Sequence, residues 1–77
     1  MKYIVTIEVD EDGQFCASCP VLPGCFSDGA TREEALANIA EAMVAYLQSL
    51  KKAGDPFPSP VEEAIVDIDM GKIEGAA

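Results

Sequence analysis

The stretch from residue 31 to residue 54 constrains the fold more than any other, because it carries the full pattern of one amphipathic helix. Thr31 and Glu34 have the spacing of a capping box, which satisfies backbone N–H groups at a helix start. Gly54 follows the basic end of this stretch and is typical of a residue that ends a helix. Between these ends, apolar residues recur at helical spacing and form one stripe, which must be covered. The stripe comprises Leu36, Ile39, Ala40, Met43, Leu47 and Leu50.

Four short segments have the alternating pattern of strands with one buried face: residues 2–9, 14–19, 25–28 and 62–69. Together with the helix they give the order β-β-β-α-β, which predicts a single α+β domain over residues 1–77. A helical crossover joins the last two strands, so we expect residues 62–69 to lie parallel to residues 2–9 in a mixed sheet. The long helix would cover one face of that sheet.

The loop between the second and third strands contains proline and glycine in positions typical of a defined β-turn. Pro20 ends the second strand because proline has no N–H to donate. Pro23 and Gly24 fit the two central positions of a type II turn, where proline presets φ and glycine accepts a positive φ. Leu22 is expected to plug the end of the core. Asp12-Gly13 similarly predicts a hairpin between the first two strands, because both positions tolerate positive φ.

The three cysteines fit packing better than metal or redox chemistry. Cys16 and Cys19 have opposite parity on a strand, so their side chains point to opposite faces. With Cys25 they supply three thiolates, whereas structural zinc takes four ligands and the chain has no histidine. A redox Cys-x-x-Cys pair belongs at a helix N-terminus rather than at a strand end. We therefore expect no metal and no cofactor, with Cys19 and Cys25 as small buried apolar residues and Cys16 also needed only for packing.

Charge narrows the classes of partner. Five basic residues against fourteen acidic ones give a net charge of −9, which disfavours direct nucleic-acid binding and anionic membrane surfaces. A basic protein is the better match. The N-terminal run is broken by Thr6 and Glu8, so it predicts a strand rather than a signal peptide. We expect a cytoplasmic protein with reduced cysteines.

Three stretches together carry a family resemblance: "YIVTIEVDEDG", "ASCPVLPGC" and "GATREEALANIAEA". In this order and spacing they closely resemble the HicB-like antitoxin family, the UPF0150 group, over about residues 3–60. The resemblance implies a partial RNase H-like fold. It also implies that Pro20, Leu22, Pro23 and Gly24 shape the bend between two strands.

The resemblance also implies a partner and a role. HicB-like proteins neutralise HicA, a small basic toxin that degrades mRNA. Many carry a C-terminal DNA-binding domain, whereas only eight residues follow position 69 here, so we expect no such domain within this sequence. Charge alone suggests the partner-facing residues: Asp10, Glu11 and Asp12 at the hairpin tip, and Asp67 and Asp69 on the last strand.

Two other classes of function stay open. A metal-dependent RNase H-like nuclease would draw carboxylates from Glu8 or Asp10, Glu34 or Glu41, and Asp67 or Asp69. Their predicted directions form no compact cluster, so we expect no enzyme. A self-associating domain without a toxin would use an unpaired sheet edge or Tyr46. Tyr46 lies with Ala35 and Ala42 on one flank of the stripe, where added core contact is the preferred interpretation. Dimerisation and toxin binding do not exclude each other, and we expect a homo-oligomer, either a dimer or a larger assembly.

Overall fold

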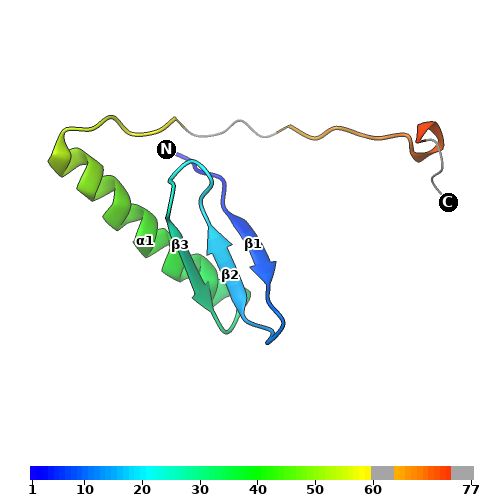
Figure 1. Ribbon diagram of the computed structural model, residues 1–77, viewed down its shortest axis with the longest axis horizontal. Coiled ribbons are helices and arrows are strands. Elements are labelled where there is room, and N and C mark those ends of the chain that lie inside the picture. Colours follow the sequence, from blue (N-terminus) through cyan, green and yellow to red (C-terminus); the bar gives the residue numbers. More distant parts are fainter. Residues whose placement is uncertain (60–63, 74–77) are drawn as a thin grey trace.

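A computed structural model describes residues 1–59 and 64–73 of the chain (Figure 1). Its sheet has three antiparallel strands in sequence order: β1 (Thr6–Val9), β2 (Phe15–Ser18) and β3 (Phe26–Gly29). The alternating pattern therefore predicted these three strands correctly. β1 is shorter than the predicted strand 2–9, and β3 is shifted by one residue from the predicted 25–28.

The pairing register fixes which side chains share a face. Ala17 of the central strand β2 pairs with Ile7 of β1, and its neighbour Cys16 pairs with Glu8. Because successive side chains on a strand point to opposite faces, Ile7 and Ala17 share one face and Glu8 and Cys16 share the other. Ala17 is buried and Cys16 is exposed, so the first of these faces is the covered one.

The β1–β2 hairpin closes through the backbone and the side chain of Asp10. Gly13 N–H donates to Asp10 O at 3.1 Å, and Asp10 Oδ1 accepts from the N–H groups of Asp12 and Gln14, both at 2.9 Å. Gly13 has a φ of +80°, whereas Asp12 does not have positive φ. The expected hairpin is present, but glycine alone takes the left-handed position, as in a turn followed by a glycine bulge.

The loop that follows β2 is made of two consecutive turns around Leu22. Leu22 N–H donates to Cys19 O, and Cys25 N–H donates to Leu22 O, both at 3.0 Å. The second turn has Pro23 and Gly24 at its centre, and Gly24 has a φ of +80°. The two turns direct the Leu22 side chain inward, where it is fully buried.

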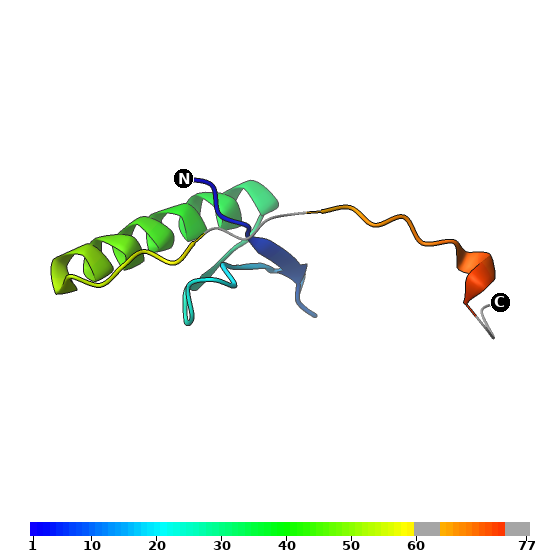
Figure 2. The same cartoon turned by 90° about the horizontal axis from the view of Figure 1, so that it is seen from above.

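The long helix α1 (Arg32–Ala53) covers one face of the sheet and packs on β3 and β2 (Figure 2). Thr31 is its N-cap, and Thr31 Oγ1 accepts from Glu34 N–H at 3.1 Å. At the other end, Gly54 N–H donates to Lys51 O at 3.1 Å and Asp55 N–H donates to Leu50 O at 2.9 Å. Gly54 has a φ of +78°, so the helix ends in the left-handed conformation that glycine favours.

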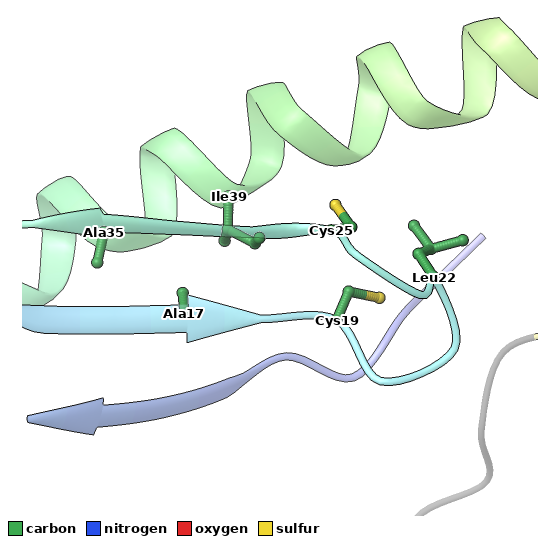
Figure 3. Close-up of a cluster of buried hydrophobic side chains, with 6 residues drawn as sticks. All are labelled: Ala17, Cys19, Leu22, Cys25, Ala35 and Ile39. Carbon is green, nitrogen blue, oxygen red and sulfur yellow. The ribbon is translucent and has the colours of Figure 1, made fainter.

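The core is small and lies between the sheet, the helix and the double turn (Figure 3). Ala35 and Ile39 from the helix meet Ala17 of β2, while the loop supplies one leucine and two thiols. Tyr46 and Ala42 pack against this cluster, in line with the expected core contact on that flank. The buried hydrophobic residues in the described part of the chain are Ala17, Cys19, Leu22, Cys25, Ala35 and Ile39.

The prediction of a fourth strand at 62–69 is wrong for the described residues. Residues 64–69 have no strand structure, and the sheet is antiparallel rather than mixed; residues 62 and 63 lie outside the described part of the chain. Residues 64–73 instead extend away from the sheet and helix and contain a short 3-10 helix, η1 (Met70–Lys72) (Figures 1 and 2). A strand forms only where its backbone finds a neighbour to bond, and alternation in the sequence does not supply that neighbour.

Candidate functional site

The sheet face opposite the helix is uncovered and carries a row of three facing residues. Cys16 of β2 pairs with Glu8 of β1 on one side and with Asp28 of β3 on the other. All three residues are exposed. The row therefore places one carboxylate on each outer strand with a thiol between them.

A second row crosses the same face one step along the strands. Ser18 pairs with Thr6 and with Phe26, and the Thr6 and Ser18 hydroxyl oxygens lie 2.8 Å apart in a hydrogen bond. Phe26 is 73 % exposed, so this face presents an aromatic side chain to solvent. The two rows line an open hollow of about 640 Å³. We call these six residues the open sheet face: Thr6, Glu8, Cys16, Ser18, Phe26 and Asp28.

This surface joins negative charge to an exposed aromatic ring. The pairing of the three strands sets which polar side chains are neighbours of Phe26 on this face. A surface of this kind suits a cationic protein partner, because carboxylates complement basic side chains and aromatic residues often anchor interfaces.

Most of the open sheet face was not singled out from the sequence. The parity of residues 2–9 and 14–19 already places Glu8, Cys16 and Ser18 on one side. The sequence predicts a third strand after β2, but it does not reveal the register of that strand on β2, which brings Phe26 and Asp28 beside them. The sequence signal for this strand was the short segment "CFSD" after the turn, in which Phe26 and Asp28 fall on the same face of a strand.

The structure disperses the acidic residues that charge alone suggested. Asp10, Glu11 and Asp12 are exposed at the β1–β2 turn, where the Asp10 carboxylate is engaged with backbone N–H groups. Asp67 and Asp69 are exposed in the C-terminal extension, and Asp69 Oδ1 accepts from Gly71 N–H at 2.9 Å. These two groups therefore do not form one surface with each other.

The carboxylates weighed for a nuclease do not meet in the described residues. Glu34 and Glu41 are exposed on α1, which covers the face opposite Glu8. Within residues 1–59 and 64–73, no group of three or more His, Cys, Asp or Glu side chains is placed to hold a metal ion. The nuclease alternative therefore has no candidate metal cluster in this part of the chain.

The cysteines divide into two kinds. Cys19 and Cys25 are buried beside Leu22 as free thiols, which matches their expected role as small core residues. Burial raises the pKa of Cys25, and the nearby Cys19 raises it further, so this thiol forms the reactive thiolate less readily than an exposed cysteine. Cys16 is exposed, so the expectation that it serves core packing is wrong. Cys16 lies three positions from the buried Cys19, so its side chain points to the opposite, uncovered face of the sheet.

No helix in the described part of the chain is long and apolar enough to span a membrane.

Comparison with known proteins gives a consistent result. Residues 3–73 match a family model described as HicB-like antitoxin of bacterial toxin–antitoxin system. A UPF0150 protein of Thermoplasma acidophilum is 51% identical over 65 residues, which cover 84% of this chain and 94% of that protein. Antitoxin HicB 1 of Photorhabdus laumondii is 35% identical over 91% of this chain, and the match covers 46% of that antitoxin.

A solved structure shows the same fold. The N-terminal domain of the Burkholderia pseudomallei antitoxin HicB superposes with a TM-score of 0.68. The match covers 77% of this chain and 69% of that one, at 24% sequence identity. At this identity the superposition speaks for the shared fold alone.

Proposed function

The chain belongs to the HicB-like antitoxin family, and from that premise we propose that it binds and neutralises a small basic toxin of the HicA type. The observation that carries the proposal is the open sheet face. It offers an exposed phenylalanine on β3, the strand that also carries Asp28, with Glu8 across the sheet on β1, on the side of the sheet that the helix leaves free.

The negative charge of the chain favours a basic partner. A toxin that cleaves mRNA must hold phosphate groups, so it presents lysine and arginine side chains around its active site. A chain with a net charge of −9 is attracted to such a surface over a long range and at a high rate. Carboxylates on the open sheet face would then occupy positions that RNA phosphates otherwise take.

Neutralisation by this route needs no chemistry from the antitoxin. The complex blocks access of RNA to the toxin, and its strength depends on the number of toxin cations paired and on the burial of Phe26. If Phe26 is one of the few anchor residues of the interface, its truncation should cost about 2 kcal/mol or more of binding free energy.

Affinity purification of the tagged chain from its native cells, followed by intact-mass analysis, tests the proposal. We expect one small, basic protein to co-elute at fixed stoichiometry and to arrest growth when expressed alone. Co-expression of the chain should restore growth.

The Phe26→Ala variant tests whether the partner binds to the open sheet face. It should retain the wild-type melting temperature, because Phe26 is exposed, and it should capture less of the partner. Recovery of the chain alone from cells that express it, or a captured protein that is not toxic, would contradict the proposal.

A further inference from the structure

A second surface lies on the covered side of the sheet, beside the free edge of β1. The helix packs on β3 and β2, so part of its apolar stripe overhangs the segment that leads into β1. This leaves a groove of about 510 Å³ between that segment and the helix. We call it the edge groove; Met1, Tyr3, Val5, Leu36, Ile39, Ala40, Met43, Val44, Leu47 and Phe57 line it.

The edge groove explains why the apolar stripe of α1 is wider than the core. Ala35 and Ile39 are buried against the strands, whereas Val44 on the overhanging side is 55 % exposed and Ala40 is also exposed. A helix that covered only three strands would not need these residues to be apolar. The stripe has the width for one further strand beside β1.

The C-terminal extension carries a segment with the pattern of that strand. Ala64, Val66, Ile68 and Met70 alternate with Ile65, Asp67 and Asp69. In the described structure this segment leaves its apolar side chains in water: Ile65 is 100 % exposed, Val66 73 % and Ile68 58 %. We call residues 64–70 the arm. Exposed apolar side chains in an alternating row mark a segment that gains free energy by association.

The chain around the arm directs it away from its own groove. The Tyr3 hydroxyl donates to Pro58 O at 2.9 Å, which holds the preceding linker against the N-terminal segment. Beyond this contact the arm departs from the sheet and helix rather than turning back along β1 (Figures 1 and 2). Pro56 and Pro58 stiffen the described part of the linker toward an extended form.

We propose that the arm of one copy pairs as a strand with the free β1 edge of a second copy and places Val66 and Ile68 in its edge groove. Reciprocal exchange gives a two-fold symmetric dimer in which each arm is covered and each sheet gains a fourth strand. The contacts of this dimer are the β1 edge and the edge groove; the added strand would border the open sheet face at β1 without using that face as its contact surface.

Charge gives the dimer a distinctive salt dependence. The outward positions of an added strand are Asp67 and Asp69, which would share a face with Glu8 of the second copy. Salt screens this like-charge repulsion, so the dimer should tighten as ionic strength rises. Binding of a basic toxin to an acidic surface should weaken under the same change. The two proposals can therefore fail separately.

Analytical ultracentrifugation of the full chain tests the exchange with two matched pairs of variants. In the arm, Val66→Asp with Ile68→Asp should raise the dimer dissociation constant at least tenfold, whereas Ile65→Asp on the outward side should change it much less. In the groove, Ala40→Glu should also raise the dimer dissociation constant at least tenfold. Ala45→Glu is its control, because Ala45 is an exposed alanine of the same helix that does not line the groove.

Mixing the two defective chains separates exchange from self-pairing. A copy with Ala40→Glu keeps a good arm, and a copy with Val66→Asp and Ile68→Asp keeps a good groove, so the mixture should form a heterodimer although neither chain dimerises alone. A monomer whose arm is protected from amide exchange would show that the arm pairs within its own chain and overturn the proposal. A dimer indifferent to all four variants, or a monomer with an unprotected arm at every concentration, would also overturn it.

Discussion

Gly29 of β3 packs directly against the backbone of Ala35 in the first turn of α1. A Cβ atom built on Gly29 would stand 2.5 Å from Ala35 N and 2.9 Å from Glu34 C, and both are backbone atoms. Gly29 is buried and pairs with Phe15, while Ala35 N–H donates to Thr31 O at 3.0 Å. The absence of a side chain at position 29 is therefore what lets the helix approach the sheet.

The Gly29→Ala variant should lower the free energy of unfolding by about 1–3 kcal/mol, because a methyl group at this site must push the helix off β3. Urea denaturation followed by circular dichroism measures the change. Ser27→Ala, on the same strand, is the control and should stay within about 0.5 kcal/mol of wild type. Equal stability of Gly29→Ala and wild type would show that the strand–helix distance is not set at this position.

The double-turn loop predicts a ranking of two substitutions. Gly24→Val should lower the melting temperature clearly, because a side chain at a φ of +80° costs about 1–2 kcal/mol and a β-branched one costs more. Cys16→Val should change stability little, because Cys16 is exposed on a strand, where valine is favoured. Thermal melts of the two variants at one concentration give the ranking, and the reverse order would contradict the architecture described for residues 19–25.

The thiols should react in two groups. In the native protein, a thiol reagent should modify Cys16 rapidly, whereas Cys19 and Cys25 should react at the rate at which the fold opens. Cys16→Ser should abolish the fast phase. Rapid modification of all three thiols in the native protein would show that the loop does not enclose Cys19 and Cys25.

The raised pKa of Cys25 adds a pH dependence of stability. The unfolded chain loses this thiol proton near the ordinary cysteine pKa, while the folded chain holds it to a higher pH. The stability that depends on keeping Cys25 protonated is therefore complete below the pKa of the unfolded thiol, and it is lost as the pH rises above that pKa. Cys25→Ala should show a smaller loss of stability than wild type between neutral and alkaline pH; parallel curves for the two proteins would contradict this origin of the pH dependence.

The sequence predicts the local elements well because their determinants are local. Thr31 and Gly54 mark both ends of α1, and alternation marks β1 and β2. The pairing of the arm is different, since residues 64–70 alternate as a strand does but no local rule says which backbone will bond to them. The expected parallel partner was the first strand of the same chain, and the described arm does not lie there.

The candidate site was less accessible from the sequence for a related reason. Net charge predicts a basic partner, but it assigns equal weight to every exposed carboxylate. Which of them act together depends on long-range pairing, as when Asp28 comes to lie across β2 from Glu8. The partner-facing roles of Asp10, Glu11, Asp12, Asp67, Asp69 and Tyr46 stay predictions.

The most direct test of the antitoxin account is the dissociation constant of the toxin complex for two double charge reversals. Glu8→Lys with Asp28→Lys changes the open sheet face, and Glu33→Lys with Glu41→Lys makes the same change in net charge on exposed positions of the helix. Calorimetric titration with the captured toxin should show a loss of at least tenfold in affinity for the first pair and a much smaller loss for the second. Equal losses for the two pairs would mean that overall charge, not the open sheet face, holds the toxin, and would contradict the account.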